Sequence, residues 1–119
     1  MNLFFVFCFF LDTKIIKVID NVNVGGTTIF TVRGENSSAR VDLILDRMKY
    51  LLSPELQLSD FNIKKVKHGE STICVKDHVL VTVTNKDASI NKTTVDKLAQ
   101  KWLGLISTKM LEVKPSNQF

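Results

Sequence analysis

The sequence predicts an α+β fold, a two-layer sandwich in which two amphipathic helices pack on one mostly antiparallel sheet, with the element order β-β-α-β-β-β-α. Two observations predict it. Over residues 39–52 and 94–111, apolar side chains recur at three- and four-residue steps, which is typical of helices with one buried face. The remaining segments are short, rich in β-branched residues and bounded by turn residues, which is typical of strands. Helices and strands that each have one apolar face favour two packed layers.

The length and composition are those of one small domain. A chain of 119 residues, 45% hydrophobic and 24% charged, can bury a core without disulfides or metal. The net charge of +4 is compatible with contact to nucleic acid or anionic lipid, but a solvated surface rich in lysine explains it more simply. We divide the chain into an apolar N-terminal segment at 1–12, a single α+β domain at 13–112 and a C-terminal tail at 113–119.

The N-terminal segment, MNLFFVFCFFL, contains nine consecutive apolar residues from Leu3 to Leu11. A bilayer span needs roughly 20, but a run of this length suits the apolar region of a signal peptide. No Lys or Arg precedes the run, and no small-residue cleavage site follows it. Three interpretations stay open: a degenerate export or membrane-proximal segment, which we favour, the truncated end of a longer chain, and a buried edge segment.

A hairpin and a helix are predicted for the first half of the domain. The pair Gly25-Gly26 supplies the positive φ angles of a tight turn between two strands. After the loop GENSS, Ser37 or Ser38 is expected to cap the helix over residues 39–52 by accepting a hydrogen bond from a backbone N–H of its first turn. Pro54 prevents this helix from continuing.

Three strands are predicted for the second half. In FNIKKVKHGE the apolar residues change face after Ile63, and a bulge near Lys64-Lys65 would restore the alternation. STICV and HVLVTVT then form two strands joined by the two-residue turn Lys76-Asp77. Within the first of these strands, Cys74 is most simply a small side chain of the core.

The polar stretch TNKDASINKTTVD joins the last strand to the second helix. Thr84 and Asp87 suit a first capped turn, and Asn91 suits a left-handed backbone position. Thr93 and Asp96 have the spacing of a capping box for the second helix. Because backbone roles account for these residues, we interpret the stretch as a structural connection and not as a site.

The candidate catalytic residues do not form a recognisable pattern. His68 and His78 are the only histidines; both lie beside turns, without a nucleophile motif near them. Of two acidic pairs, Asp42 with Asp46 is more simply an exposed charged face of a helix, with Arg47 and Lys49 nearby. The other, Asp77 with Asp87, lacks the pattern of a calcium loop. We therefore expect a chain that is not an enzyme and has no cofactor, no catalytic residue and no metal site.

Two segments have features of an anion contact. GENSSAR places a Gly-containing loop before a helix N-terminus, but it lacks the ending of a nucleotide-binding loop, so helix capping explains it more simply. In KKVKHG, Lys64, Lys65 and Lys67 form a candidate basic patch for phosphates or an anionic lipid surface. No aromatic residues interleave with these lysines, which argues against single-stranded nucleic acid.

The segments ICVKDHVLVTVT, TVTNKDA and LAQKW resemble a small extracytoplasmic domain of cyanobacterial proteins. In those proteins, which are small-conductance mechanosensitive channel homologues, the domain precedes the membrane region. VGGTTIF resembles the hairpin of the same family, and the resemblance covers roughly residues 22–111. The turn Lys76-Asp77 departs from the family, which tends to have Gly or Asn there. No transmembrane segment follows Phe119, so the chain would be an isolated copy or a fragment of such a domain.

The resemblance implies a non-enzymatic accessory or interaction domain that is extracytoplasmic or membrane-proximal. Its expected partner is another protein, in particular a membrane-protein neighbour, and no small-molecule substrate is indicated. The alternative is a small basic module in the cytoplasm that binds nucleic acid or a protein partner, which the net charge of +4 motivates.

Overall fold

The computed structural model describes residues 19–34 and 36–115 and confirms the α+β class. The N-terminal segment 1–12 and the last four residues of the tail lie outside the described residues. The elements follow one another in this order: β2 (Ile19–Val24), β3 (Thr27–Arg33), α1 (Ser37–Leu51), a 3₁₀ turn (Leu58–Asp60), β4 (Phe61–Lys65), a second 3₁₀ turn (Lys67–Gly69), β5 (Ser71–Val75), β6 (His78–Val83), α2 (Asn85–Ile90) and α3 (Val95–Val113).

The strands form two antiparallel sheets, which corrects the expectation of one. β2 and β3 make a hairpin, whose turn has the predicted positive φ angles at Gly25 and Gly26. β4, β5 and β6 make a separate three-stranded sheet with β5 in the middle. The two sheets stay separate because α1 lies beside the outer edge of β6, where Arg40 and Arg47 donate hydrogen bonds to backbone carbonyls of that strand.

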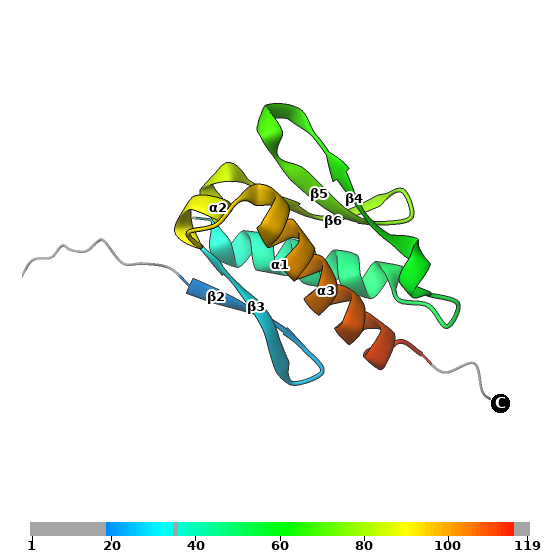
Figure 1. The fold of residues 1–119 in the computed structure, drawn as a ribbon. Coiled ribbons are helices and arrows are strands. Elements are labelled where there is room, and N and C mark those ends of the chain that lie inside the picture. The colour runs from blue at the N-terminus through cyan, green and yellow to red at the C-terminus, as the bar shows by residue number, and fades with distance from the viewer. Residues whose placement is uncertain (1–18, 35, 116–119) are drawn as a thin grey trace, which may run out of the picture.

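α3 packs across both sheets and carries the centre of the core. Figure 1 shows this helix crossing in front of α1, with the three-stranded sheet on one side and the β2–β3 hairpin on the other. The ring of Trp102 stacks on that of Phe30 in β3, with centroids 4.5 Å apart. The apolar face predicted for this helix is buried, with one exception: Leu105, at the border of the face, is 36% exposed. One long helix therefore joins the two sheets.

The bulge predicted near Lys64-Lys65 is absent, and the three-stranded sheet has its register shift between β5 and β6 instead. β4 pairs with β5 without interruption and ends at Lys65, which leaves Val66 outside the strand and exposed. The register between β5 and β6 shifts at Leu80, which has no partner on the neighbouring strand. Both Leu80 and Val81 are buried. The bulge therefore lets two successive side chains of β6 enter the core.

The backbone positions before α3 differ by one residue from the prediction. Thr94, and not Thr93, precedes the helix, and its hydroxyl accepts a hydrogen bond from the N–H of Lys97 at 3.2 Å. The left-handed position is Lys92, with φ 55°, whereas Asn91 has φ −88°. Thr93 and Thr94 have the same side chain, so only the path of the chain decides which of them caps the helix. At Asn91-Lys92 the path of the chain puts the left-handed position on lysine, although asparagine adopts it more readily.

The serine caps predicted for α1 are wrong. The residue before the helix is Asn36, and its side chain makes no capping bond. Ser37 is buried, and its hydroxyl donates to the carboxylate of Asp20 in β2. A tertiary contact between the helix and the hairpin has thus taken the place of the local one.

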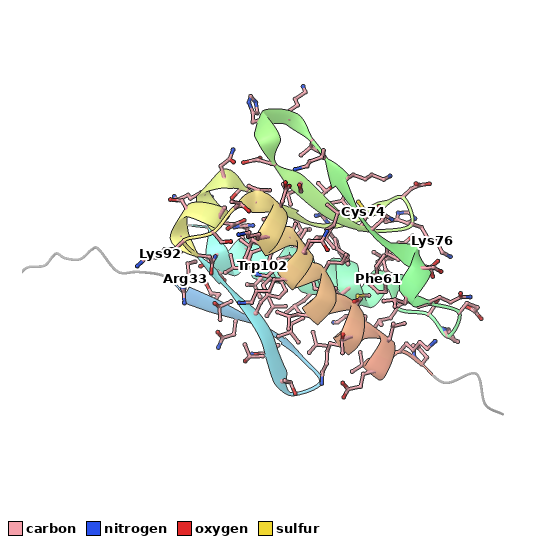
Figure 2. The ribbon with its side chains drawn as sticks, in the orientation of Figure 1. Arg33, Phe61, Cys74, Lys76, Lys92 and Trp102 are labelled. Carbon is pink, nitrogen blue, oxygen red and sulfur yellow. The ribbon has the colours of Figure 1, made fainter. Side chains whose placement is uncertain are left out.

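The turn between β5 and β6 forms without the glycine or asparagine that such turns favour. Lys76 has φ 56°, a left-handed conformation that costs a residue with a side chain about 1 kcal/mol. Neighbouring groups hold it there: its N–H donates to the carbonyl of Asp60 at 2.7 Å, and Asn62 Nδ2 donates to its carbonyl at 3.1 Å. Figure 2 shows Lys76 on the rim of the molecule. Cys74 is buried in β5, as predicted.

We expect Lys76→Gly to raise the free energy of unfolding by about 1 kcal/mol, because glycine adopts positive φ without a steric cost. Urea denaturation of the two proteins measures this difference. Lys76→Ala is the matched control: it removes the same charge but keeps a Cβ atom in the left-handed region, so it should not stabilise. Equal stabilisation by both substitutions would contradict the backbone explanation.

Candidate functional site

The three lysines of the predicted basic patch lie at the end of β4 and in the turn after it. Lys64 and Lys65 are successive strand residues, so their side chains point to opposite faces of the sheet. Lys64 Nζ lies 3.4 Å from Asp77 Oδ1, and Lys65 pairs with Asp96 at the start of α3. Lys67 is exposed in the turn. The geometry separates Lys64 from Lys65, and contact of these lysines with a partner stays a prediction.

The two histidines lie at opposite ends of the three-stranded sheet. His68 is in the turn before β5, and its backbone carbonyl accepts a hydrogen bond from Asn85 Nδ2 at 2.9 Å. His78 opens β6, and its ring lies edge-on to that of Tyr50, with centroids 6.4 Å apart. Within the described residues, no hydrogen bond or ion pair joins either imidazole to a carboxylate or a hydroxyl. The histidines therefore do not share a site.

A buried ion pair joins α1 to the first turn of α2. Arg40 Nη1 donates to Asp87 Oδ1 and Nη2 donates to Asp87 Oδ2, both at 2.8 Å, so the two groups meet through two parallel hydrogen bonds. Arg40 Nη2 also donates to the carbonyl of Thr82 at 3.1 Å. The side chain of Asp87 is 4% exposed and that of Arg40 is 29% exposed. The carboxylate is thus removed from water and paired.

The same aspartate forms the first turn of α2. Thr84 Oγ1 accepts a hydrogen bond from the N–H of Asp87, and Asp87 Oδ2 accepts one from the N–H of Thr84, each at 3.0 Å. This reciprocal pair is a capping box, which confirms the predicted capped turn at these two residues. Sequence reasoning missed Arg40, because nothing local to Asp87 identifies a partner 47 residues away.

The charges of this pair are fixed by its hydrogen bonds. Burial by itself raises the pKa of Asp87, but the hydrogen bonds from Arg40 and from the Thr84 N–H outweigh burial and lower that pKa below its ordinary value. The pKa of Arg40 is raised, chiefly by its hydrogen bond to Asp87. Both groups are therefore charged at neutral pH. Because structural donors occupy the carboxylate, its role here is to hold the fold.

The acidic pairs found in the sequence do not form a cation site in the described part of the chain. Asp42 and Asp46 lie on the exposed side of α1, whereas Asp77 is in an open turn and Asp87 is buried. No group of three or more His, Cys, Asp or Glu residues with metal-binding geometry occurs within residues 19–34 and 36–115. Over the same ranges, every helix is too short or too polar to span a bilayer.

An exposed surface with aromatic and apolar side chains runs along α1 and onto β6. Leu43 is 48% exposed and Tyr50 is 81% exposed, and their seven-residue spacing places them on the same side of the helix. Val79, on the adjacent strand, is 38% exposed. We call this surface the Tyr50 face and define it by five residues: Leu43, Arg47, Tyr50, His78 and Val79.

Arg47 lies at the centre of the Tyr50 face. Its Nη1 donates to the backbone carbonyl of Leu80 at 3.4 Å, which holds the guanidinium against the edge of β6. Arg47 lines an open depression of about 350 Å³ together with Asp46, Tyr50, Leu51, His78 and Val79. The surface thus combines a cation, a carboxylate, an exposed aromatic ring and aliphatic side chains around a shallow hollow.

The comparison with protein families covers most of the domain. A family model described as "Domain of unknown function (DUF8459)" matches residues 21–113, from β2 to the end of α3. The match includes Arg40, Asp87 and the whole Tyr50 face. No curated protein and no solved structure matches the chain.

We expect Asp87→Asn to lower the free energy of unfolding at neutral pH by about 3 kcal/mol, because it leaves the partly buried guanidinium of Arg40 without its counter-charge. Chemical denaturation measures this loss. Asp77→Asn is the matched control: it removes an aspartate from the solvent-exposed pair with Lys64 and should change stability little. Equal losses from the two substitutions would show that the buried pair has no special role.

The same pair predicts how stability depends on pH. Because the pKa of Asp87 is lower in the folded protein than in the unfolded chain, its stabilising contribution is complete above the ordinary aspartate pKa of about 3.9. That contribution is lost as the pH falls through the lower, folded-state pKa. Below about pH 4, the unfolding free energy should therefore fall more steeply for the wild-type protein than for Asp87→Asn. Parallel pH profiles of the two proteins would contradict this assignment.

Proposed function

The chain belongs to the family described as a domain of unknown function, DUF8459, and we propose that it is a non-enzymatic interaction domain that acts outside the cytoplasm beside a membrane protein. The observation that carries the proposal is the Tyr50 face. Tyrosine and arginine are the residue types most enriched among the energetically important positions of protein interfaces. Here both occur on one exposed surface, around a hollow that a partner's side chain can enter.

The rigidity of the Tyr50 face supports the same proposal. Tyr50 and Arg47 are carried by one helix, and a hydrogen bond of 3.4 Å from Arg47 to the Leu80 carbonyl favours one orientation of the guanidinium. A preorganised side chain loses less conformational entropy on binding than a free one. A tyrosine ring adds a large contact area with few rotatable bonds. The surface therefore has the features of a binding face more than those of an ordinary solvated helix.

A non-enzymatic role is supported by how the polar groups are used. The buried carboxylate–guanidinium pair between Asp87 and Arg40 holds α1 to α2, and hydrogen bonds occupy both oxygens of the carboxylate. His68 and His78 lie beyond opposite ends of β5, so they do not meet in a common pocket. A reaction site needs an acid, a base or a nucleophile within reach of one another.

The location and the partner class in this proposal come from sequence. TVTNKDA and LAQKW resemble the extracytoplasmic domain of the mechanosensitive channel homologues, in which the domain lies next to a membrane region. The apolar run from Leu3 to Leu11 is compatible with export or with a position near the membrane. A membrane-protein neighbour is accordingly the partner that we propose for the Tyr50 face.

Site-specific photocrosslinking in the native cells tests the proposed surface. With p-benzoylphenylalanine in place of Tyr50, we expect an adduct with an integral membrane protein. The same group in place of Thr108, an exposed residue of α3, is the matched control and should give no such adduct. The proposal fails if the Tyr50 position crosslinks only to soluble proteins, or if both positions give the same products.

The intact mass of the native protein tests the proposed location. We expect a protein in the exported or membrane-associated fraction. A mass lacking about the first dozen residues would show that the N-terminal segment acts as a cleaved signal. A full-length protein found only in the soluble cytoplasmic fraction would refute export and favour the cytosolic binding module instead.

A further inference from the structure

Four residues on the outer side of α1 form a stripe that has two opposite charges between two large uncharged side chains. The stripe consists of Leu43, Asp46, Arg47 and Tyr50, and their spacing places them along one side of the helix. Leu43, Asp46 and Tyr50 are exposed, and Arg47 is half-buried. The α1 stripe, as we call these four residues, therefore offers both charge and apolar area to a partner.

The two charges of the α1 stripe lack a counter-charge among the described residues. Asp46 and Arg47 are successive, so their side chains do not face each other on the helix. Neither forms an ion pair with a residue of 19–34 or 36–115. The hydrogen bond from Arg47 to the Leu80 carbonyl is long, at 3.4 Å, and goes to a neutral group. Both charges can therefore pair with another molecule.

A twofold axis halfway between Asp46 and Arg47 makes the α1 stripe complementary to itself. Across this axis, a second α1 packed antiparallel places Asp46 opposite Arg47 of the second copy. Leu43 and Tyr50 each lie about 5 Å along the helix from the axis, so they also come opposite one another. Each contact occurs twice, as a symmetric dimer requires. A parallel pair would instead bring like charges together, which repel.

The other charged residues of α1 fit the same antiparallel arrangement. Asp42 precedes the axis and Lys49 follows it, and both are exposed. Arg40 is already paired inside the fold with Asp87. The charges of α1 that face solvent are thus acidic before the axis and basic after it. In the antiparallel pair, the acidic half of each helix lies along the basic half of the other.

We propose that a second copy of this chain binds the Tyr50 face through an antiparallel pair of α1 helices. The hollow beside Tyr50 adds complementarity of shape, because Leu43 of the second copy comes opposite Tyr50 and can enter it. This proposal rests on the proposed function in taking the Tyr50 face as a contact surface. The dimer covers the surface that we assign to the membrane neighbour, so self-association competes with that partner and regulates access to it.

Charge reversal in the full-length protein tests this pairing, with dimerisation measured by sedimentation equilibrium. We expect the wild-type protein to dimerise as its concentration rises. Asp46→Arg and Arg47→Asp, each alone, should weaken the dimer about tenfold or more, because like charges then face each other. An equimolar mixture of the two variants should regain the wild-type affinity. In that mixture, one stripe carries two positive charges and the other carries two negative charges.

Glu112→Arg and Lys101→Asp are the matched controls for net charge. Both change exposed residues of α3 and should leave the dimer unchanged. Circular dichroism of each variant shows whether it folds. If Arg47→Asp does not fold, Arg47→Glu replaces it with the same expected result, since glutamate keeps more of the aliphatic stem.

Three results would overturn the proposal. One is a protein that stays monomeric at every concentration. Another is a dimer that neither charge reversal weakens, because a different surface, such as the apolar N-terminal segment, would then form it. The third is a mixture of folded variants that does not regain affinity, because Asp46 and Arg47 would then not face each other.

The dimer and the membrane partner can fail independently. A monomeric protein whose Tyr50 position still crosslinks to an integral membrane protein would overturn the dimer and leave the proposed function in place. A dimer that the charge reversals disrupt, in a protein that gives no membrane adduct, would support the dimer and refute the membrane partner.

Discussion

The ion pair between Arg40 and Asp87 is the contact on which the arrangement of this fold depends. The two sheets share no hydrogen-bonded strands, so helices connect them: α3 packs on both sheets, and α1 lies against β2 and β6. The ion pair holds α1 in its position beside β6. Asp87 also forms the first turn of α2, which leads directly into α3. The carboxylate of Asp87 thus holds α1 to α2 and sets the point from which the chain enters α3. Desolvation offsets much of the attraction in a buried pair, so its main contribution is to specify one arrangement over others.

α1 also covers the outer edge of β6. Arg40 and Arg47 are seven residues apart, which is two turns or about 10 Å along the helix, and both donate to backbone carbonyls of β6. Arg40 forms the ion pair with Asp87, and Arg47 belongs to the Tyr50 face. The outer edge of β6, which would otherwise expose unpaired carbonyls, is therefore covered by the same helix that carries the ion pair and Tyr50.

The corrected predictions share one physical feature. In each, the local sequence allows two arrangements, and contacts with residues far along the chain decide which one forms. Ser37 is a good capping residue by type, but the carboxylate of Asp20 takes its hydroxyl. Alternation alone places one of the pair Leu80 and Val81 outside, but a bulge buries both. The separation of Lys64 from Lys65 follows from the two-residue period of a strand and was available from sequence; their pairing with Asp77 and Asp96 was not.

The sequence by itself determined the α+β class, the two long helices, the Gly25-Gly26 turn and the capped turn at Thr84 and Asp87. These features depend on periodicity and on neighbours within about four residues, so a short window contains their cause. Only the tertiary structure decided that the strands form two sheets, that Arg40 reaches Asp87, and that α1 and β6 together form the Tyr50 face. Each of these joins residues tens of positions apart, 47 in the case of the ion pair, and no local pattern encodes such a contact.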